Sequence, residues 1–164
     1  KLTPTWTNTT PTTVTGYLRV WLLARLRLLR PISHRAHEEH RRMEAWLAAV
    51  ERCVGWDEAL AFEVARAAQL VKGYGDVRRR LVAAFEHLLA TVLRTAELEA
   101  ASDGDFRVAA GLAARYRALV LAGPEREAEA PALAGEVVQR LEARDRPAAL
   151  AMVVGAQGGG EASL

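Results

Sequence analysis

Cysteine, lysine and aromatic residues are scarce in this chain of 164 residues, which holds one cysteine, Cys53, and only two lysines. A single cysteine excludes an intrachain disulfide framework, a zinc ribbon and a cysteine-ligated iron–sulfur cluster. No uninterrupted apolar run reaches the roughly 18 residues that a membrane-spanning helix needs. Arg25 and Arg27 interrupt the best candidate, residues 17–29. The chain also begins with Lys1 rather than methionine, so we expect it to be a piece of a longer protein.

Alanine and arginine dominate what is present, with 32 and 20 residues, and the hydrophobic share is 51%. This composition is ordinary for a folded globular chain and too apolar for general disorder. β-Branched and aromatic residues are sparse after Val20, whereas alanine, leucine, arginine and glutamate favour helices. We therefore predict an all-α fold, a bundle of five to six helices with a short extended N-terminal arm.

The pattern of turn residues divides the chain into three parts. Residues 1–16 are rich in threonine and contain two prolines, so they are predicted to form an extended arm or linker. Residues 17–147 are predicted to form the helical domain, and residues 148–164 a flexible tail. An acidic stretch at residues 125–129 is interpreted as a solvated loop. Apolar periodicity places helices at about 17–29, 34–54, 57–72, 76–99, 106–121 and 131–144. Gly55-Trp56 breaks the second of these, and Asp57 is expected to cap the third.

The first two predicted helices carry broad apolar faces. Helix 17–29 is apolar around well over half of its circumference, so it should lie within an assembly or against another domain. Arg25 projects from that apolar side and would need a carboxylate or carbonyl partner, which makes it a candidate buried or interface charge. The predicted core stripe of the second helix consists of Ala36, Met43, Trp46, Leu47, Val50, Cys53 and Val54.

The most unusual local string is VKGYGDVRRR at residues 71–80. Two glycines allow a sharp turn, Gly73 is expected to be left-handed, and Asp76 is expected to cap the helix that follows. Free amides at that helix start, close to the lysine, would suit an anion. The candidate docking or anion-binding turn consists of Lys72, Gly73, Tyr74, Gly75 and Asp76. The alternative is a plain helix–helix turn whose basic first turn faces solvent.

A second candidate group is formed by histidines at three-residue spacing, followed by Glu44. His37, His40 and Glu44 would span about 60° of one helix, so a divalent metal could bridge them, and the chain would then be an enzyme in its own right. The alternative, which we favour, is that these residues form ordinary surface pairs with neighbouring arginines and glutamates and that the chain holds no metal. Cys53 is interpreted as a small core residue rather than as a catalytic thiol.

Charge is distributed unevenly along the chain. Residues 1–80 hold 14 basic and 8 acidic residues, a net +6, whereas residues 81–164 hold 8 and 12, a net −4. This asymmetry favours packing of one half on the other or on a partner of opposite sign. It also leaves open a free-standing basic helical module that binds nucleic acid or a protein, although no nucleic-acid-binding motif is present and nucleic acid is not the expected partner.

Several strings resemble one known family in their order and spacing. They are residues 12–17, the leucine-rich residues 18–31, EAWLA at 44–48, residues 59–65 and VKGYGD at 71–76. Over about residues 12–93 the chain resembles the C-terminal helical domain of the indolepyruvate oxidoreductase beta-subunit family, within the 2-oxoacid:ferredoxin oxidoreductases. After Asp76 it departs from that family and reads Val-Arg-Arg-Arg in place of a Thr-His pair.

The resemblance implies a cytoplasmic parent enzyme that oxidatively decarboxylates aryl-2-oxoacids with coenzyme A. Thiamine diphosphate and iron–sulfur clusters would serve that enzyme, with ferredoxin or a similar acceptor. This chain shows no thiamine-binding pattern and lacks the cysteines for clusters, so no cofactor is expected in it. Its expected role is that of a non-catalytic accessory domain. Its expected partners are the catalytic domains or subunit of the parent, with self-association left open and no membrane.

Overall fold

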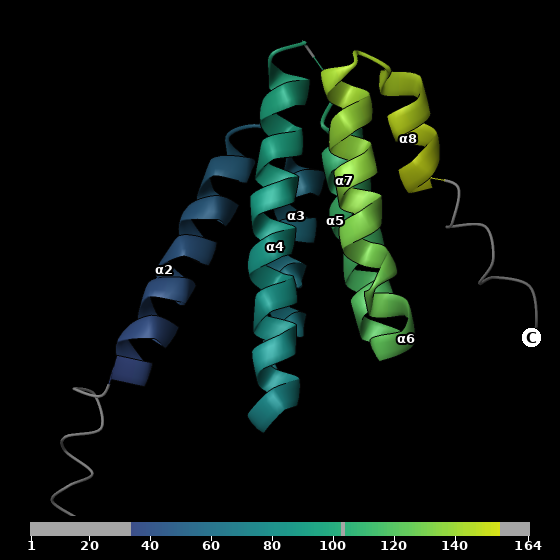
Figure 1. Cartoon of the computed structure of the whole chain (residues 1–164). Helices are drawn as coiled ribbons and strands as arrows, with labels where there is room; N and C mark the ends of the chain where they lie inside the picture. Colours follow the sequence, from purple (N-terminus) through teal and green to yellow (C-terminus); the bar gives the residue numbers. More distant parts are fainter. Residues whose placement is uncertain (1–33, 103, 155–164) are drawn as a thin grey trace, which may run out of the picture. The chain divides into compact units, whose positions relative to one another are not determined.

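A computed structural model of the chain describes residues 34–102 and 104–154, and among these it contains helices and no strand. The elements are α2 (His34–Val54), α3 (Glu58–Arg66), the 3₁₀ helix η2 (Ala67–Leu70), α4 (Gly75–Ala100), α5 (Arg107–Leu121), α6 (Pro124–Glu127), α7 (Glu129–Glu142) and α8 (Arg146–Val154) (Figure 1). Six of these helices have nine residues or more, which confirms the predicted all-α bundle. The predicted arm, the predicted helix at 17–29 and Arg25 lie outside the described residues.

The chain divides into two compact units between Glu44 and Ala45, so that α2 contributes to both. Within the second unit, α5 packs against α3, α4, α7 and α8, and α4 also packs against α7 (Figure 1). Helix α5 can have neighbours on several sides because its buried residues include small ones, Ala109 and Ala113 among them. Small side chains let helix axes approach closely, so the core of this unit is centred on α5.

The apolar stripe predicted for residues 34–54 is only partly buried in α2. Cys53 is fully buried and Trp46 packs against the core, where its indole Nε1 donates a hydrogen bond to the Val64 carbonyl at 3.1 Å. Met43, Leu47 and Val54 are exposed instead, which corrects their placement in the core. Periodicity identifies residues that share a face, but it does not say how much of a wide apolar face a neighbour covers.

Several helix boundaries differ from the predicted ones. The Asp57 carboxylate caps α3 as expected and accepts a hydrogen bond from the Leu60 N–H at 2.8 Å. Helix α3 nevertheless ends at Arg66 and continues as η2 to Leu70, short of the predicted end at residue 72. The acidic stretch at 125–129 is not a loop, because its residues complete α6 and begin α7. Acidic residues are favourable in the first turn of a helix, so their clustering there is consistent with helix starts.

Residues 148–154, where we expected the flexible tail to begin, belong to α8. Ala149 and Val153 are buried against the bundle. Helix α8 passes close to α5 at Gly111, where the β-carbon of any other residue would lie 2.8 Å from Val153 Cγ2. The short apolar run therefore folds because a glycine on α5 leaves room for it. None of the helices in residues 34–102 and 104–154 is long and apolar enough to cross a membrane.

Candidate functional site

The five residues of the predicted docking turn, 72–76, connect η2 to the start of α4, and all five are exposed. Gly73 has φ +86° and Gly75 has φ +57°, so both glycines adopt the left-handed backbone that other residues rarely adopt. The predicted left-handed conformation of Gly73 is thus confirmed. Between the two glycines, the Tyr74 side chain is 93% exposed. The backbone of this turn therefore holds an aromatic side chain out into solvent.

Asp76 does not cap α4 as predicted. The helix begins one residue earlier, at Gly75, so that Tyr74 occupies the N-cap position without a side-chain hydrogen bond. Asp76 lies in the first turn, where its carboxylate pairs with Arg79. Arg80 Nε lies 2.9 Å from Glu127 Oε2. Carboxylates of the same chain thus pair with two of the arginines that follow the turn, while Lys72 is exposed.

The predicted histidine group does not form a compact cluster of ligands. His40 Nε2 lies 3.1 Å from Glu44 Oε1, and both side chains are 65% exposed. Within residues 34–102 and 104–154, no group of three or more His, Cys, Asp or Glu side chains is arranged to hold a metal ion. The arrangement of His40 and Glu44 matches the surface-pair interpretation. Cys53 is buried as expected, and burial raises the pKa of its thiol.

Glu99 is a fully buried carboxylate that sequence reasoning missed. It lies in the last turn of α4 and accepts hydrogen bonds from the backbone N–H groups of Val108 and Ala109 at 3.3 and 2.9 Å. Arg146 Nε, at the start of α8, lies 3.5 Å from Glu99 Oε1, and the same guanidinium pairs with Asp105. Burial raises the pKa of Glu99, although the two N–H groups and Arg146 oppose that rise. One carboxylate thus connects α4, α5 and α8.

A sequence signal for Glu99 did exist. Val92, Ala96 and Glu99 follow one another at four- and three-residue spacing, so the carboxylate falls on the apolar stripe of its helix. A lone acid on such a stripe, a few residues before the next helix start, indicates a cap for that next helix.

Two further polar contacts link helices of the core. Arg117 on α5 is 6% exposed and pairs with the Glu63 carboxylate on α3. Tyr116 is buried, and its hydroxyl lies 2.9 Å from His87 Nδ1 on α4. Burial, followed by the nearby negative charge of Glu127, raises the pKa of Tyr116 to about 12. Each of these groups has a partner on another helix, so both contacts serve to fix the helices together.

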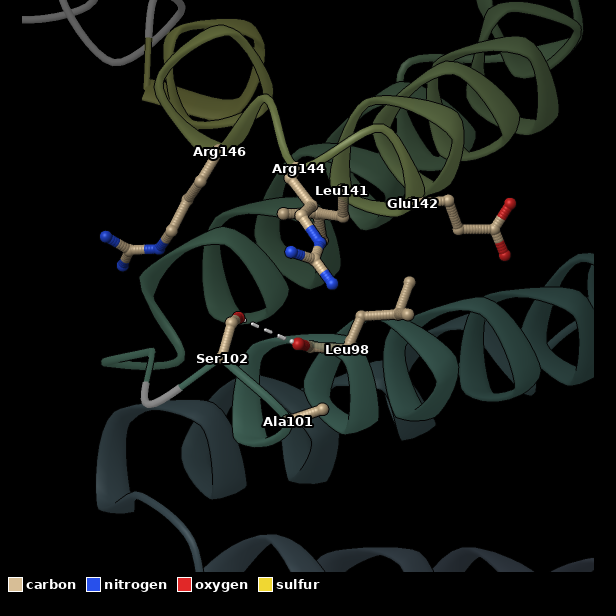
Figure 2. Close-up of a pocket in the computed structure, with 7 residues that line it drawn as sticks. All are labelled: Leu98, Ala101, Ser102, Leu141, Glu142, Arg144 and Arg146. Atoms are coloured by element: carbon tan, nitrogen blue, oxygen red, sulfur yellow. Dashed lines mark hydrogen bonds between the residues drawn. The ribbon is translucent and has the colours of Figure 1, made fainter.

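A pocket of about 430 Å³ lies where α4 and α7 end and α8 begins. Figure 2 shows the Arg144 side chain extending from the α7–α8 connection toward the end of α4, whereas Glu142 points away. The residues that line the pocket are Leu98, Ala101, Ser102, Leu141, Glu142, Arg144 and Arg146. The sequence did not indicate this pocket, because its residues come from segments separated by about 40 positions.

Residues 5–91 match the model of one protein family, which is described as a family of unknown function (DUF6537). The match covers more than half of the chain. The chain belongs to this family. The DUF6537 match includes the docking turn and ends within α4, so Glu99 and the pocket lie beyond it. No curated protein and no solved structure matches the chain.

Proposed function

We propose that this chain is a non-catalytic helical accessory or assembly domain of an indolepyruvate (aryl-2-oxoacid):ferredoxin oxidoreductase. The proposal is supported by the order and spacing of EAWLA and VKGYGD, which resemble the C-terminal domain of the beta-subunit family. The DUF6537 match at residues 5–91 covers nearly the same stretch as that resemblance, which runs over about residues 12–93. The all-α fold is consistent with a helical appended domain.

The observation that carries an assembly role is the exposure of Tyr74. Its side chain contributes almost no buried surface to this chain, yet the turn that presents it contains two left-handed glycines. Aromatic side chains are among the commonest anchors of protein–protein interfaces, since one ring buries a large area at a small cost in side-chain entropy. Val77, one turn along α4, is also exposed and adds apolar surface at the same place.

In this proposal the reaction takes place in other domains or subunits of the parent enzyme. That enzyme would decarboxylate an arylpyruvate, releasing CO₂, and would join the remaining aryl-acetyl group to coenzyme A. The two electrons released would pass to ferredoxin through iron–sulfur clusters. Thiamine diphosphate and the clusters would be bound outside this chain, because a single buried cysteine cannot ligate a cluster.

The test uses the intact parent enzyme with Tyr74→Ala, and Phe62→Ala as the matched control. Phe62 on α3 is another exposed aromatic residue, outside the docking turn. We expect Tyr74→Ala to weaken assembly, measured by light scattering after size exclusion, and to slow arylpyruvate-dependent reduction of ferredoxin. Phe62→Ala should change neither. Deletion of this whole region with unchanged assembly and activity would contradict the proposal.

The alternative, a free-standing basic module that binds nucleic acid or a protein, gains little from the structure. Several arginines are paired with acids of the same chain, including Arg52 with Glu97 and Arg94 with Glu142. Such pairing reduces the positive charge available for phosphates. Binding to DNA or RNA that weakens steeply with salt would favour this alternative, and absence of binding at low salt would remove it.

A further inference from the structure

The pocket between the ends of α4 and α7 combines an apolar lining with polar groups, as small-molecule sites do. Its volume of about 430 Å³ falls within the usual range for such sites. Leu98, Ala101 and Leu141 contribute apolar surface. The Arg144 guanidinium contributes hydrogen-bond donors, whereas the Ser102 hydroxyl already donates to the Leu98 carbonyl and keeps only its oxygen as an acceptor. A ligand that fits this lining would have an apolar body and at least one polar group.

The backbone at Arg144 is unusual for an arginine. It has φ +60°, and it occupies the position after α7 where glycine is most common. The Arg144 N–H donates to the Leu141 carbonyl at 2.9 Å, and the Asp145 N–H donates to the Arg140 carbonyl at 2.8 Å, so the end of α7 has the hydrogen bonds of a Schellman motif. A non-glycine residue in this conformation costs about 1 kcal/mol. Glycine would satisfy the fold better, so stability does not account for the arginine.

The other charged groups around the pocket are engaged elsewhere. Glu142 pairs with Arg94 at 3.1 Å and points away from the cavity (Figure 2). The guanidinium of Arg146 is held by Glu99 and Asp105. In the part of the chain that the structure describes, Arg144 forms no ion pair. Its guanidinium is thus the cation at the pocket that is left for a ligand.

The backbone carbonyl groups at the end of α4 also lie beside the pocket. Carbonyl groups in the last turns of two helices carry partial negative charge, which would oppose an anion. Here the Leu98 carbonyl accepts from Ser102 Oγ at 2.9 Å, and the Glu99 carbonyl accepts from the Gly104 N–H at 2.8 Å. Donors of the same chain thus bind these two carbonyls, which do not need the guanidinium of Arg144.

We propose that this pocket binds a small organic anion, a carboxylate on an apolar body, with Arg144 holding the carboxylate and Leu98 and Leu141 contacting the body. An arginine guanidinium presents parallel N–H donors that match the two oxygens of a carboxylate. The site lies outside the docking turn and does not depend on the proposed assembly role.

The test measures binding of hexanoate to the full chain by titration calorimetry, with Arg144→Gly as the main variant. Glycine removes the guanidinium and relieves the left-handed backbone, so the variant should unfold at the same temperature as the original chain or higher. We expect saturable binding of hexanoate that weakens about tenfold or more in Arg144→Gly. Arg126→Ala, which removes an exposed arginine outside the pocket, should leave it unchanged.

Acetate and inorganic phosphate serve as additional probes. Acetate carries the same carboxylate with almost no apolar body, and inorganic phosphate has neither a carboxylate nor an apolar body. Both should therefore bind more weakly than hexanoate. Equal affinity for all three would overturn the assignment of an apolar body. Absence of saturable hexanoate binding, or equal binding by Arg144→Gly, would overturn the site itself.

Discussion

The Glu99 carboxylate accepts a hydrogen bond from the backbone N–H of Ala109 at 2.9 Å, and through this contact the last turn of α4 caps the first turn of α5. Val108 donates a second N–H to the same side chain. Phe106, at the N-cap position of α5, makes no side-chain hydrogen bond to the helix. The start of the central helix therefore depends on a residue seven positions before its own N-cap.

Replacing Glu99 by alanine should destabilise the chain. The substitution leaves two buried N–H groups without an acceptor and removes a charge partner of Arg146. An unsatisfied buried donor costs about 1–3 kcal/mol, so we expect a loss in that range or above it in the free energy of unfolding. Urea unfolding followed by tryptophan fluorescence would measure it. Glu136→Ala, an exposed glutamate on α7, is the control and should change the value by less than about 0.5 kcal/mol.

The same carboxylate should make stability depend on pH. Burial raises the pKa of Glu99 above its ordinary value of 4.5, so the folded chain holds this proton more tightly than the unfolded chain. The stability that this proton contributes is present below pH 4.5 and is lost as the pH rises through the folded pKa. Glu99→Gln cannot lose the proton, so it should cost less stability at pH 7 than at pH 4. An equal cost at both values would show that the pKa is not raised.

Gly111 on α5 and Gly135 on α7 differ in the space available for a side chain, so substitutions at the two positions can be compared. A β-carbon at Gly111 would lie 2.8 Å from Val153 Cγ2, whereas one at Gly135 on α7 would meet nothing within 4 Å. Gly111→Ala should displace α8 and speed hydrogen exchange of residues 146–154. Gly135→Ala should instead stabilise the chain by about 0.5–1 kcal/mol, because alanine favours the helix. Unchanged exchange in Gly111→Ala would mean that α8 is not packed at this point.

The Arg117–Glu63 pair should be worth more than an exposed pair. Glu63→Ala leaves the guanidinium of Arg117, which is 6% exposed, without its carboxylate, so we expect a loss of about 2 kcal/mol or more in unfolding free energy. Glu129→Ala breaks the exposed pair with Arg126 and removes a first-turn acid of α7, so it should cost about 1 kcal/mol or less. Denaturant midpoints of the two variants compare the pairs directly.

The raised pKa of Tyr116 should make the folded chain less stable in strongly alkaline solution. Its pKa rises to about 12 from an ordinary value of 10, because burial disfavours the phenolate. The folded chain keeps this proton while the unfolded chain loses it, so stability falls as the pH rises from about 10 toward 12. Tyr116→Phe should remove this part of the pH dependence. An absorbance titration at 295 nm should show a phenolate signal near pH 12 that the substitution removes. The signal near pH 10 should be the same with and without the substitution.

Helix identity was predictable to a useful degree, and helix ends were less so. Asp57 caps α3 as its position after Gly55-Trp56 indicated, and Gly73 has the left-handed backbone expected of it. The start of α4 at Gly75, before Asp76, was not predicted, because the side chain of an aspartate does not decide which backbone residue begins a helix. The turn at residues 72–76 was predicted from its glycines, whereas the exposure of Tyr74 between them required the structure.

By itself, the sequence determined that this chain folds as helices, because apolar residues recur at three- and four-residue spacing and turn residues separate the helical segments. Only the tertiary structure decided which side of each helix is covered. It left Leu47 exposed on a stripe that looked like core, and it buried Glu99 where a carboxylate looked out of place. The physical reason is that periodicity acts along one helix, whereas burial, capping by Glu99 and the pocket at Arg144 depend on segments that are distant in the sequence and meet only when the helices pack.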